Sequence, residues 1–536
     1  MDLFPPHLEA TPTPIEEFVD ERRPVRWREV VAVLLLVVVC DLAMYRGRGF
    51  TGYALLFALA PACLAFGSDL HRGRRQGWLF VAVLFALAFR LAWCGSWLAV
   101  GCGYFCLIAL TMCLAGQMPQ ILSMLAFTGQ SLAAGAIGLN QYGETARRNL
   151  QPLKSSTWIA VIMPLGALGL FGTIFILANP DLVSFVSKEW QLWLDRVSEW
   201  LIHFSILEIP FWIVTAWITV GLLRPLEWRG GDSPSKTVDP TSFAPQSAAL
   251  FPAFRNTLLA VIVLCVVYLA FEFQTLWFRT FPKGFHYSGY AHEGAAWLTI
   301  ALALATMTLS LIFRGQMLQD PRLAALKRLA WVWSALNLFL AVAVYNRLWI
   351  YVGFNGLTWM RMVGFFGTSA VVIGFLLAVY KIAQHRNFVW LIRADLWALV
   401  ATIIAFALTP VDLIVMRYNT QRIMAGDSAP SVQISVHPID AEGILQLLPL
   451  VDCPDEIVRN GVRAYFAQHW IRLEALGVNR PVSIARWDDF SRLQISERLL
   501  ANELTAHREA WEPFHADSVK RNAAWSRFKE YAYQWY

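Results

Sequence analysis

Residues 256–277 read NTLLAVIVLCVVYLAFEFQTLW, and Glu272 is the only charged side chain in this stretch. A helix needs roughly 20 mostly apolar residues to cross about 30 Å of hydrocarbon, so the stretch is long enough to span a membrane. Across the 536-residue chain, 57% of the residues are hydrophobic and 15% are charged. Soluble domains carry about one quarter charged residues. The sequence therefore predicts an all-α polytopic membrane protein.

Apolar stretches of similar length recur along the chain, separated by short segments rich in Arg, Lys, Pro and Gly. About 11 transmembrane helices are predicted from them. Their approximate ranges are 29–45, 50–67, 77–95, 97–115, 156–178, 200–223, 256–277, 293–313, 329–350, 358–380 and 394–411. The apolar runs stop after Pro410, and a small, mostly helical extramembrane domain is expected over residues 412–536.

The distribution of basic residues predicts the orientation. Four arginines, between residues 22 and 28, precede the first apolar run, which begins at Val30. Basic residues favour the cytoplasmic side, so the arm 1–28 is expected in the cytoplasm and the C-terminal domain outside it. The arm lacks the opening of a signal peptide, and the first run is expected to remain as an anchor. These features predict a multi-pass membrane protein whose N-terminus lies in the cytoplasm.

Residues 119–140 follow the first membrane helices (29–118) and are only moderately apolar. They contain Gln130, Ser131 and Asn140. If this segment were a span, the later basic loops would all move to the outer side, against the positive-inside rule. It is therefore predicted to be a re-entrant or interfacial element, with irregular backbone covered by protein or a cavity.

Three further segments complete the predicted organisation. The membrane helices of 141–229 include an amphipathic helix over 181–201, whose tryptophans favour a position at the membrane interface. Residues 230–253 are rich in Pro, Ser and Gly and predict a flexible linker before a second helix set, 254–411. In the C-terminal domain, the alternation of Val432, Ile434 and Val436 favours a short strand, and residues 454–476 favour a helix.

The candidate functional residues are ionisable side chains inside the predicted spans. A charge in hydrocarbon costs a few kcal/mol or more, so such groups face other helices or water. They could line an outward-facing polar vestibule that binds a ligand, or they could be snorkelling side chains and ion pairs between helices. This candidate intramembrane polar cluster consists of Asp41, Arg90, Glu208, Glu272, Arg347 and Arg361.

Common enzyme signatures are missing. The chain has no GxxxxGK[ST] phosphate loop, no HExxH zinc helix and no GxSxG nucleophile turn. Cys102, Cys106 and Cys113 share a helix face, but without further ligands they are interpreted as small apolar contacts rather than a metal site. No catalytic, cofactor-binding or metal-binding residue is predicted. The basic residues are explained by orientation, so no nucleic-acid partner is expected.

Several short motifs resemble a bacterial multi-pass membrane protein family of unknown function, domain-of-unknown-function groups 4153 and 4173. The resemblance covers roughly residues 140–500. Its central motif comprises Tyr351, Gly356, Leu357, Thr358 and Arg361, preceded by Arg347. Other matching pieces are Pro164 with Ala178-Asn179-Pro180, Leu223-Arg224-Pro225, Phe273-Gln274 with Tyr287 and Tyr290, and Arg417-Tyr418-Asn419 with Arg422. The resemblance implies a helical membrane bundle and no activity. It also implies a bacterial inner-membrane protein of the cell envelope.

The chain departs from the family pattern at two places. Residues 290–294 read Tyr-Ala-His-Glu-Gly where Tyr-Ala-Arg-x-Gly is expected, and Val411-Asp412 stands where Asn-Pro is expected. In the central motif, Gly356 suits a tight turn and Thr358 suits a helix N-cap. The alternative is that Thr358, Arg361 and Arg347 hold an anionic group at the start of the next helix.

Three functions remain open from the sequence. The first is a transport-like or ligand-binding protein that uses the outward-facing vestibule. The second is an envelope sensor or assembly scaffold anchored by the helix bundle. The third is an intramembrane enzyme acting on a lipid or polymer, for which no catalytic set is identified. The expected partners are the lipid bilayer and either an envelope protein or a small polar ligand.

Overall fold

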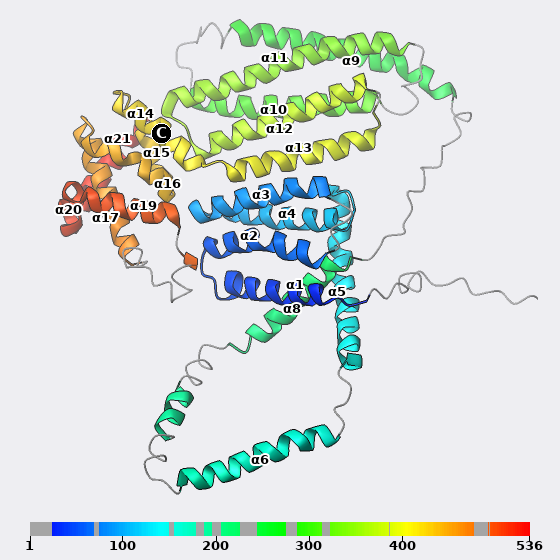
Figure 1. Cartoon of the computed structure of the whole chain (residues 1–536). Helices are drawn as coiled ribbons and strands as arrows, with labels where there is room; N and C mark the ends of the chain where they lie inside the picture. Colours follow the sequence, from blue (N-terminus) through cyan, green and yellow to red (C-terminus); the bar gives the residue numbers. More distant parts are fainter. Residues whose placement is uncertain are drawn as a thin grey trace, which may run out of the picture. The chain divides into compact units, whose positions relative to one another are not determined.

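The structure is a computed structural model. It describes residues 24–68, 74–149, 155–177, 187–195, 205–225, 244–274, 287–313, 322–384, 386–475, 491–492 and 494–535. Within these ranges the chain is helical and contains no strand (Figure 1). Packing divides it into two units. Unit 1 comprises Met1–Arg48, Leu55–Leu84 and Cys106–Arg229, and unit 2 comprises Gly49–Ala54, Phe85–Phe105 and Gly230–Tyr536.

The first group of apolar helices precedes the predicted linker at residue 230. They are α1 (Trp27–Cys40) with a π-helical turn (Asp41–Tyr45), α2 (Phe50–Gly67), α3 (Arg74–Trp93), α4 (Trp97–Leu114), α5 (Ile121–Asn149), α6 (Ser155–Leu177) and α8 (Glu208–Leu223). The later apolar helices are α9 (Ala244–Glu272), α10 (Tyr287–Ile312), α11 (Leu323–Asn355), α12 (Trp359–Ala383) and α13 (Phe388–Leu408).

Eight helices in the described part of the chain are long and apolar enough to cross a membrane. Seven of them overlap predicted spans, and the eighth is α5. The predicted spans 29–45, 156–178, 200–223 and 293–313 coincide with helices α1, α6, α8 and α10. Of the last three, the described portions Met163–Ile176, Glu208–Leu223 and Ala296–Ser310 are shorter apolar helices. The chain thus has the helices of a membrane protein, while the count of eleven stays a prediction.

In unit 1, α1 and α8 run antiparallel and are joined near both ends. At one end, Arg224 Nε lies 3.0 Å from Glu29 Oε2, and at the other Arg46 Nε donates to Glu208 Oε1 at 2.8 Å. Close packing of α8 on α5 depends on glycine. A Cβ on Gly221 would lie 1.9 Å from the carbonyl oxygen of Ser131, so no larger residue fits without movement.

The expectation for residues 119–140 needs correction. These residues do not form an irregular re-entrant backbone, because α5 is one unbroken helix from Ile121 to Asn149. Its length and composition would allow a span. Figure 1 draws α5 crosswise to α1, which belongs to the same unit and is the first predicted span. The crosswise course favours the interfacial alternative, which stays a prediction.

Two other segment predictions change in part. Of the predicted linker 230–253, residues 244–253 already belong to α9, and residues 230–243 lie outside the described residues. Of the predicted amphipathic helix 181–201, residues 187–195 are helical with exposed side chains, and the remainder lies outside the described residues. Trp190 and Trp193 stack with ring centroids 5.0 Å apart, as expected for side chains on one helix face.

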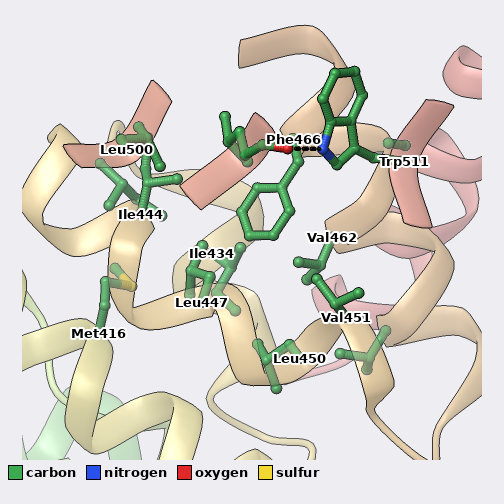
Figure 2. Close-up of a cluster of buried hydrophobic side chains, with 14 of the residues drawn as sticks. Met416, Ile434, Ile444, Leu447, Leu450, Val451, Val462, Phe466, Leu500 and Trp511 are labelled. Carbon is green, nitrogen blue, oxygen red and sulfur yellow. Dashed lines mark hydrogen bonds between the residues drawn. The ribbon is translucent and has the colours of Figure 1, made fainter. Parts of the chain in front are cut away.

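The C-terminal residues form short helices around an apolar core (Figure 2). The helices are α14 (Val411–Met424), α15 (Ser431–Val436), α16 (Ala441–Ile444), a 3-10 helix (Leu445–Asp452), α17 (Glu456–Ala475), α19 (Ile495–Ala506), α20 (Arg508–Ala516) and α21 (Ser518–Tyr533). Trp511, fully buried, donates its indole N–H to the Leu504 carbonyl at 2.8 Å. The side chains of Phe466 and Phe528 are also fully buried.

Two expectations for this region are wrong or altered. The predicted strand at Val432, Ile434 and Val436 is helix α15, and Gln433 between them is buried as well, so the alternation does not separate a core face from a solvent face. The expected domain boundary at residue 412 does not separate two hydrophobic cores. The C-terminal core also contains Val352, from the end of α11, and Leu357, from the turn after it.

Candidate functional site

The candidate polar residues of unit 1 form a group around Arg46. The Arg46 guanidinium contacts Asp41 Oδ2 at 3.0 Å and Glu208 Oε1, while the Trp212 indole donates to Asp41 Oδ1 at 2.9 Å. Asp41 lies in the π-helical turn at the end of α1, and Glu208 begins α8. Two buried carboxylates therefore share one partly exposed arginine, which joins α1 to α8.

In unit 2, Glu272 and Arg347 form a buried ion pair between α9 and α11. Their exposed fractions are 0% and 2%, and Arg347 Nε donates to Glu272 Oε1 at 2.7 Å. Tyr268 donates its hydroxyl to Glu272 Oε2 and accepts from Arg347 Nη2, both at 2.9 Å. A Cβ on Gly294 of α10 would lie 1.8 Å from Arg347, so this glycine makes room for the guanidinium. The charges compensate each other within the bundle.

Arg90 of α3 pairs with a residue that the sequence did not single out. Its two terminal nitrogens donate to Glu442 Oε2 at 2.9 Å and to Oε1 at 2.8 Å, and the Trp93 indole donates to Oε2 at 3.0 Å. Glu442, in α16, is 1% exposed. Burial raises its pKa, whereas Arg90 and Trp93 lower it. This bidentate pair joins α3 to the C-terminal helices.

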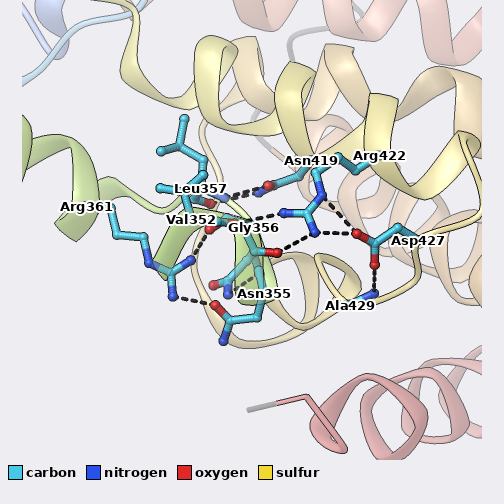
Figure 3. Close-up of polar contacts among 11 residues, drawn as sticks. Val352, Asn355, Gly356, Leu357, Arg361, Asn419, Arg422, Asp427 and Ala429 are labelled. Atoms are coloured by element: carbon cyan, nitrogen blue, oxygen red, sulfur yellow. Dashed lines mark hydrogen bonds and ion pairs between the residues drawn. The ribbon is translucent and has the colours of Figure 1, made fainter. Parts of the chain in front are cut away.

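The turn between α11 and α12 brings two pieces of the family-like motif together (Figure 3). Asn419 of α14 accepts from the Leu357 N–H and donates to the Leu357 carbonyl, both at 2.8 Å. Arg422 donates to the carbonyls of Val352 and Gly353 at the end of α11, also at 2.8 Å. These side chains satisfy backbone groups that a helix end leaves free, so the Arg-Tyr-Asn…Arg segment supports the Gly-Leu-Thr turn.

Gly356 and Thr358 have the turn and cap roles expected of them. Gly356 has a φ of +97°, and a Cβ there would lie 2.5 Å from Asn419 Oδ1 and 2.9 Å from Pro430. The Thr358 hydroxyl accepts from the Arg361 N–H at 3.1 Å and caps α12. Both the backbone angle and the lack of space require glycine.

Arg361 differs from the other candidate arginines because no carboxylate neutralises it among the described residues. Its guanidinium donates to the Gly356 carbonyl and to Asn355 Oδ1, and its central carbon lies 3.7 Å from the centroid of the Tyr351 ring. The residue is 5% exposed, and its Nε has no hydrogen-bond partner. A buried cation without a counter-charge is costly, and a cation–π contact compensates only part of that cost.

Arg361 lines a cavity of about 1120 Å³ within unit 2. One wall comes from α10, α11 and α12, and it includes the apolar side chains of Ile300 and Leu348 beside Arg361. The other wall comes from the start of α14 and the segment before α16, and it carries Asp412 and Asp440. Such a mixed, concave surface suits an amphipathic ligand.

The structure thus separates the six predicted residues into different environments. Asp41 and Glu208 meet in unit 1, Glu272 and Arg347 pair in unit 2, and Arg90 pairs with Glu442; Arg361 alone among the six lines the cavity. Arg347 is not available for the predicted alternative in which it holds an anion together with Thr358 and Arg361, because it is paired with Glu272.

The sequence analysis missed Glu442, Gln433 and the cavity role of Asp412. Gln433 donates to the Asn355 carbonyl at 2.9 Å. All three follow the last predicted span, where a charged or polar residue is unremarkable. The one sequence feature that could have indicated the role of Asp412 was the departure from the family pattern at Val411-Asp412. A carboxylate stands there where the resemblance leads to Asn-Pro.

Comparison with known proteins supplies the family. No curated protein matches the chain, and no solved structure matches it. The model of a domain of unknown function, DUF4153, matches residues 30–437. The match begins earlier than the expected resemblance and ends at the segment that borders the cavity, before the remaining C-terminal helices. Because it covers most of the chain, this protein belongs to the DUF4153 family.

Proposed function

We propose that this protein is a ligand-binding membrane protein that holds the phosphate group of an amphipathic ligand at Arg361. The observation that carries the proposal is a buried guanidinium that lines a cavity without a carboxylate partner among the described residues. A guanidinium presents several N–H donors in one plane and matches the oxygens of a phosphate. A bound phosphate would supply the missing counter-charge.

The walls of the cavity support an amphipathic ligand rather than a free anion. Trp359 and Met360 line it at the start of α12 and are 50% and 62% exposed. In a helix long and apolar enough to cross a membrane, such side chains are suited to contact with acyl chains. The bilayer is itself a source of phosphate-bearing amphiphiles. The positive-inside pattern favours the outer side for this end of α11 and α12, which supports an outward-facing site.

The test is lipid binding by the purified full chain in detergent, with dihexanoyl phosphatidylglycerol as the probe. Arg361→Gln is expected to weaken binding about tenfold or more, because a charge-assisted hydrogen bond contributes roughly 1.5–3 kcal/mol. Arg417→Gln is the matched control, since Arg417 is exposed on α14. Arg361→Lys should bind with intermediate affinity. Equal affinities for the wild type and Arg361→Gln, with both folded by thermal unfolding, would reject the proposal.

A sensor is the second candidate function, favoured by the shared wall of the cavity. Asp412 lines the cavity, and about two and three turns further along α14 Asn419 and Arg422 hold the α11–α12 turn. A ligand bound in the cavity would therefore contact α14, the first of the C-terminal helices, directly. Hydrogen exchange of α14–α21 with and without the probe tests this. Protection confined to the cavity walls would favour binding alone. Deletion of residues 412–536 is unsuitable, because it would expose the shared core.

A further inference from the structure

The cavity that contains Arg361 also presents negative charge. Asp412 and Asp440 both line it, and the Asp440 N–H donates to Asp412 Oδ2 at 2.8 Å. Among the described residues, neither carboxylate forms an ion pair. Partial desolvation raises the pKa of both carboxylates and Arg90 lowers it from a distance, but the two terminal nitrogens of Arg90 donate to Glu442 and not to them. One cavity therefore holds one unpaired cation and two unpaired carboxylates.

These opposite charges do not pair with each other. Arg361 instead donates to Gly356 and Asn355, on the side of the α11–α12 turn. Left without a ligand, the 5% exposed Arg361 lacks a counter-charge, which is unfavourable for a buried cation. Asp412 is half-buried and Asp440 is exposed, so both carboxylates are accessible to a cationic group. A ligand that carries an anionic and a cationic group on one headgroup would compensate both at once.

We propose that the cavity selects a zwitterionic phospholipid headgroup with a primary ammonium, in which the phosphate contacts Arg361 and the ammonium contacts Asp412 and Asp440. This inference rests on the proposed function and names its ligand class. A primary ammonium has three N–H donors for carboxylate oxygens, whereas a trimethylated ammonium has none. Phosphatidylethanolamine has this chemistry, and phosphatidylglycerol has the phosphate without the ammonium.

Water-soluble headgroups and whole lipids share this chemistry, so the experiment separates them. Glycerophosphoethanolamine carries both charges and no acyl chains. The apolar side chains of Ile300, Leu348 and Trp359 predict that it binds more weakly than dihexanoyl phosphatidylethanolamine. Equal affinity of these two probes would overturn the lipid as the source of the headgroup.

The decisive comparison measures the affinity of the full chain in detergent for dihexanoyl phosphatidylethanolamine, phosphatidylglycerol and phosphatidylcholine, in the presence of EDTA. The wild type is expected to favour the ethanolamine lipid over both others by about tenfold or more, the size of one charge-assisted contact. The double variant Asp412→Asn/Asp440→Asn should bring the ethanolamine and glycerol lipids to within about twofold of each other. An asparagine at 412 retains an oxygen that can accept the Asp440 N–H, so the local fold is kept.

The control is Asp452→Asn, which makes the same Asp-to-Asn change once, at a side chain that is 88% exposed, and it should leave the preference unchanged. A wild type that binds the glycerol lipid as tightly as the ethanolamine lipid would overturn this inference. If Arg361→Gln still weakened both lipids, the proposed phosphate site would stand. A preference for the glycerol lipid that appears only when Ca²⁺ replaces EDTA would assign the carboxylates to a metal ion and also overturn the ammonium contact. No binding of any lipid would reject both proposals.

Discussion

Arg347 and Arg361 lie on either side of the α11–α12 turn, and both are buried, with exposed fractions of 2% and 5%. Arg347 is held by Glu272 and Tyr268, whereas Arg361 has backbone, amide and aromatic partners but no carboxylate among the described residues. The sequence presents both as arginines near the ends of apolar helices. Their partners differ, and so do their inferred roles. A compensated charge joins helices, and an uncompensated one facing a cavity is available to a ligand.

Breaking the compensated pair should have the largest effect. Arg347→Met would leave Glu272 buried without its partner, which costs about 3–5 kcal/mol, and we expect a strongly lowered melting temperature in detergent. The double variant Glu272→Gln/Arg347→Met should recover most of the loss. Arg361→Met leaves no buried carboxylate behind and should cost about 1–3 kcal/mol through lost hydrogen bonds. If Arg361→Met destabilised the protein as much as Arg347→Met, the distinction between the two arginines would be wrong.

The turn that separates the two arginines should be the next most sensitive feature. Gly356→Ala would force an L residue into a φ of +97° and place its Cβ against Asn419 and Pro430. Gly426→Ala is a matched control, because Gly426 has a φ of +94° and nothing within 4 Å of the added Cβ. The control should lose about 1–2 kcal/mol to backbone strain, and Gly356→Ala should lose more. Equal melting temperatures would show that the turn moves to accommodate the methyl group.

The smallest effect is expected at His469, a half-buried side chain that is neutral in the folded protein near pH 7. Burial lowers the pKa of His469 to about 4 from 6.5, and Arg472 acts in the same direction. The unfolded chain therefore binds more protons between these values, so the stability from His469 is present above pH 6.5 and is lost as the pH falls toward 4.

The loss would be no more than about 1.4 kcal/mol per pH unit. His469→Gln should flatten the acid limb of a plot of melting temperature against pH over this interval. An unchanged acid limb would mean that His469 is already protonated, or solvated, in the folded protein.

The sequence by itself determined the membrane class, the positions of most long helices, and the turn at Gly356 with its cap at Thr358. Hydrophobic length and local turn chemistry are properties of neighbouring residues, so they can be read without knowing the fold. The family resemblance likewise rested on short local motifs, and the match to residues 30–437 confirms it.

Only the tertiary structure decided which charges meet. Arg90 and Glu442 are 352 residues apart in sequence, and no local pattern links them. The strand expected at 432–436 failed for a related reason: a short apolar run cannot be assigned by periodicity alone. Here packing buries Gln433 together with Val432 and Ile434 and leaves Val436 exposed. The end of the last span likewise did not mark a domain boundary, because Val352 and Leu357 complete the C-terminal core. The compensation of Arg347 and the isolation of Arg361 follow from such distant contacts, which hydropathy does not encode.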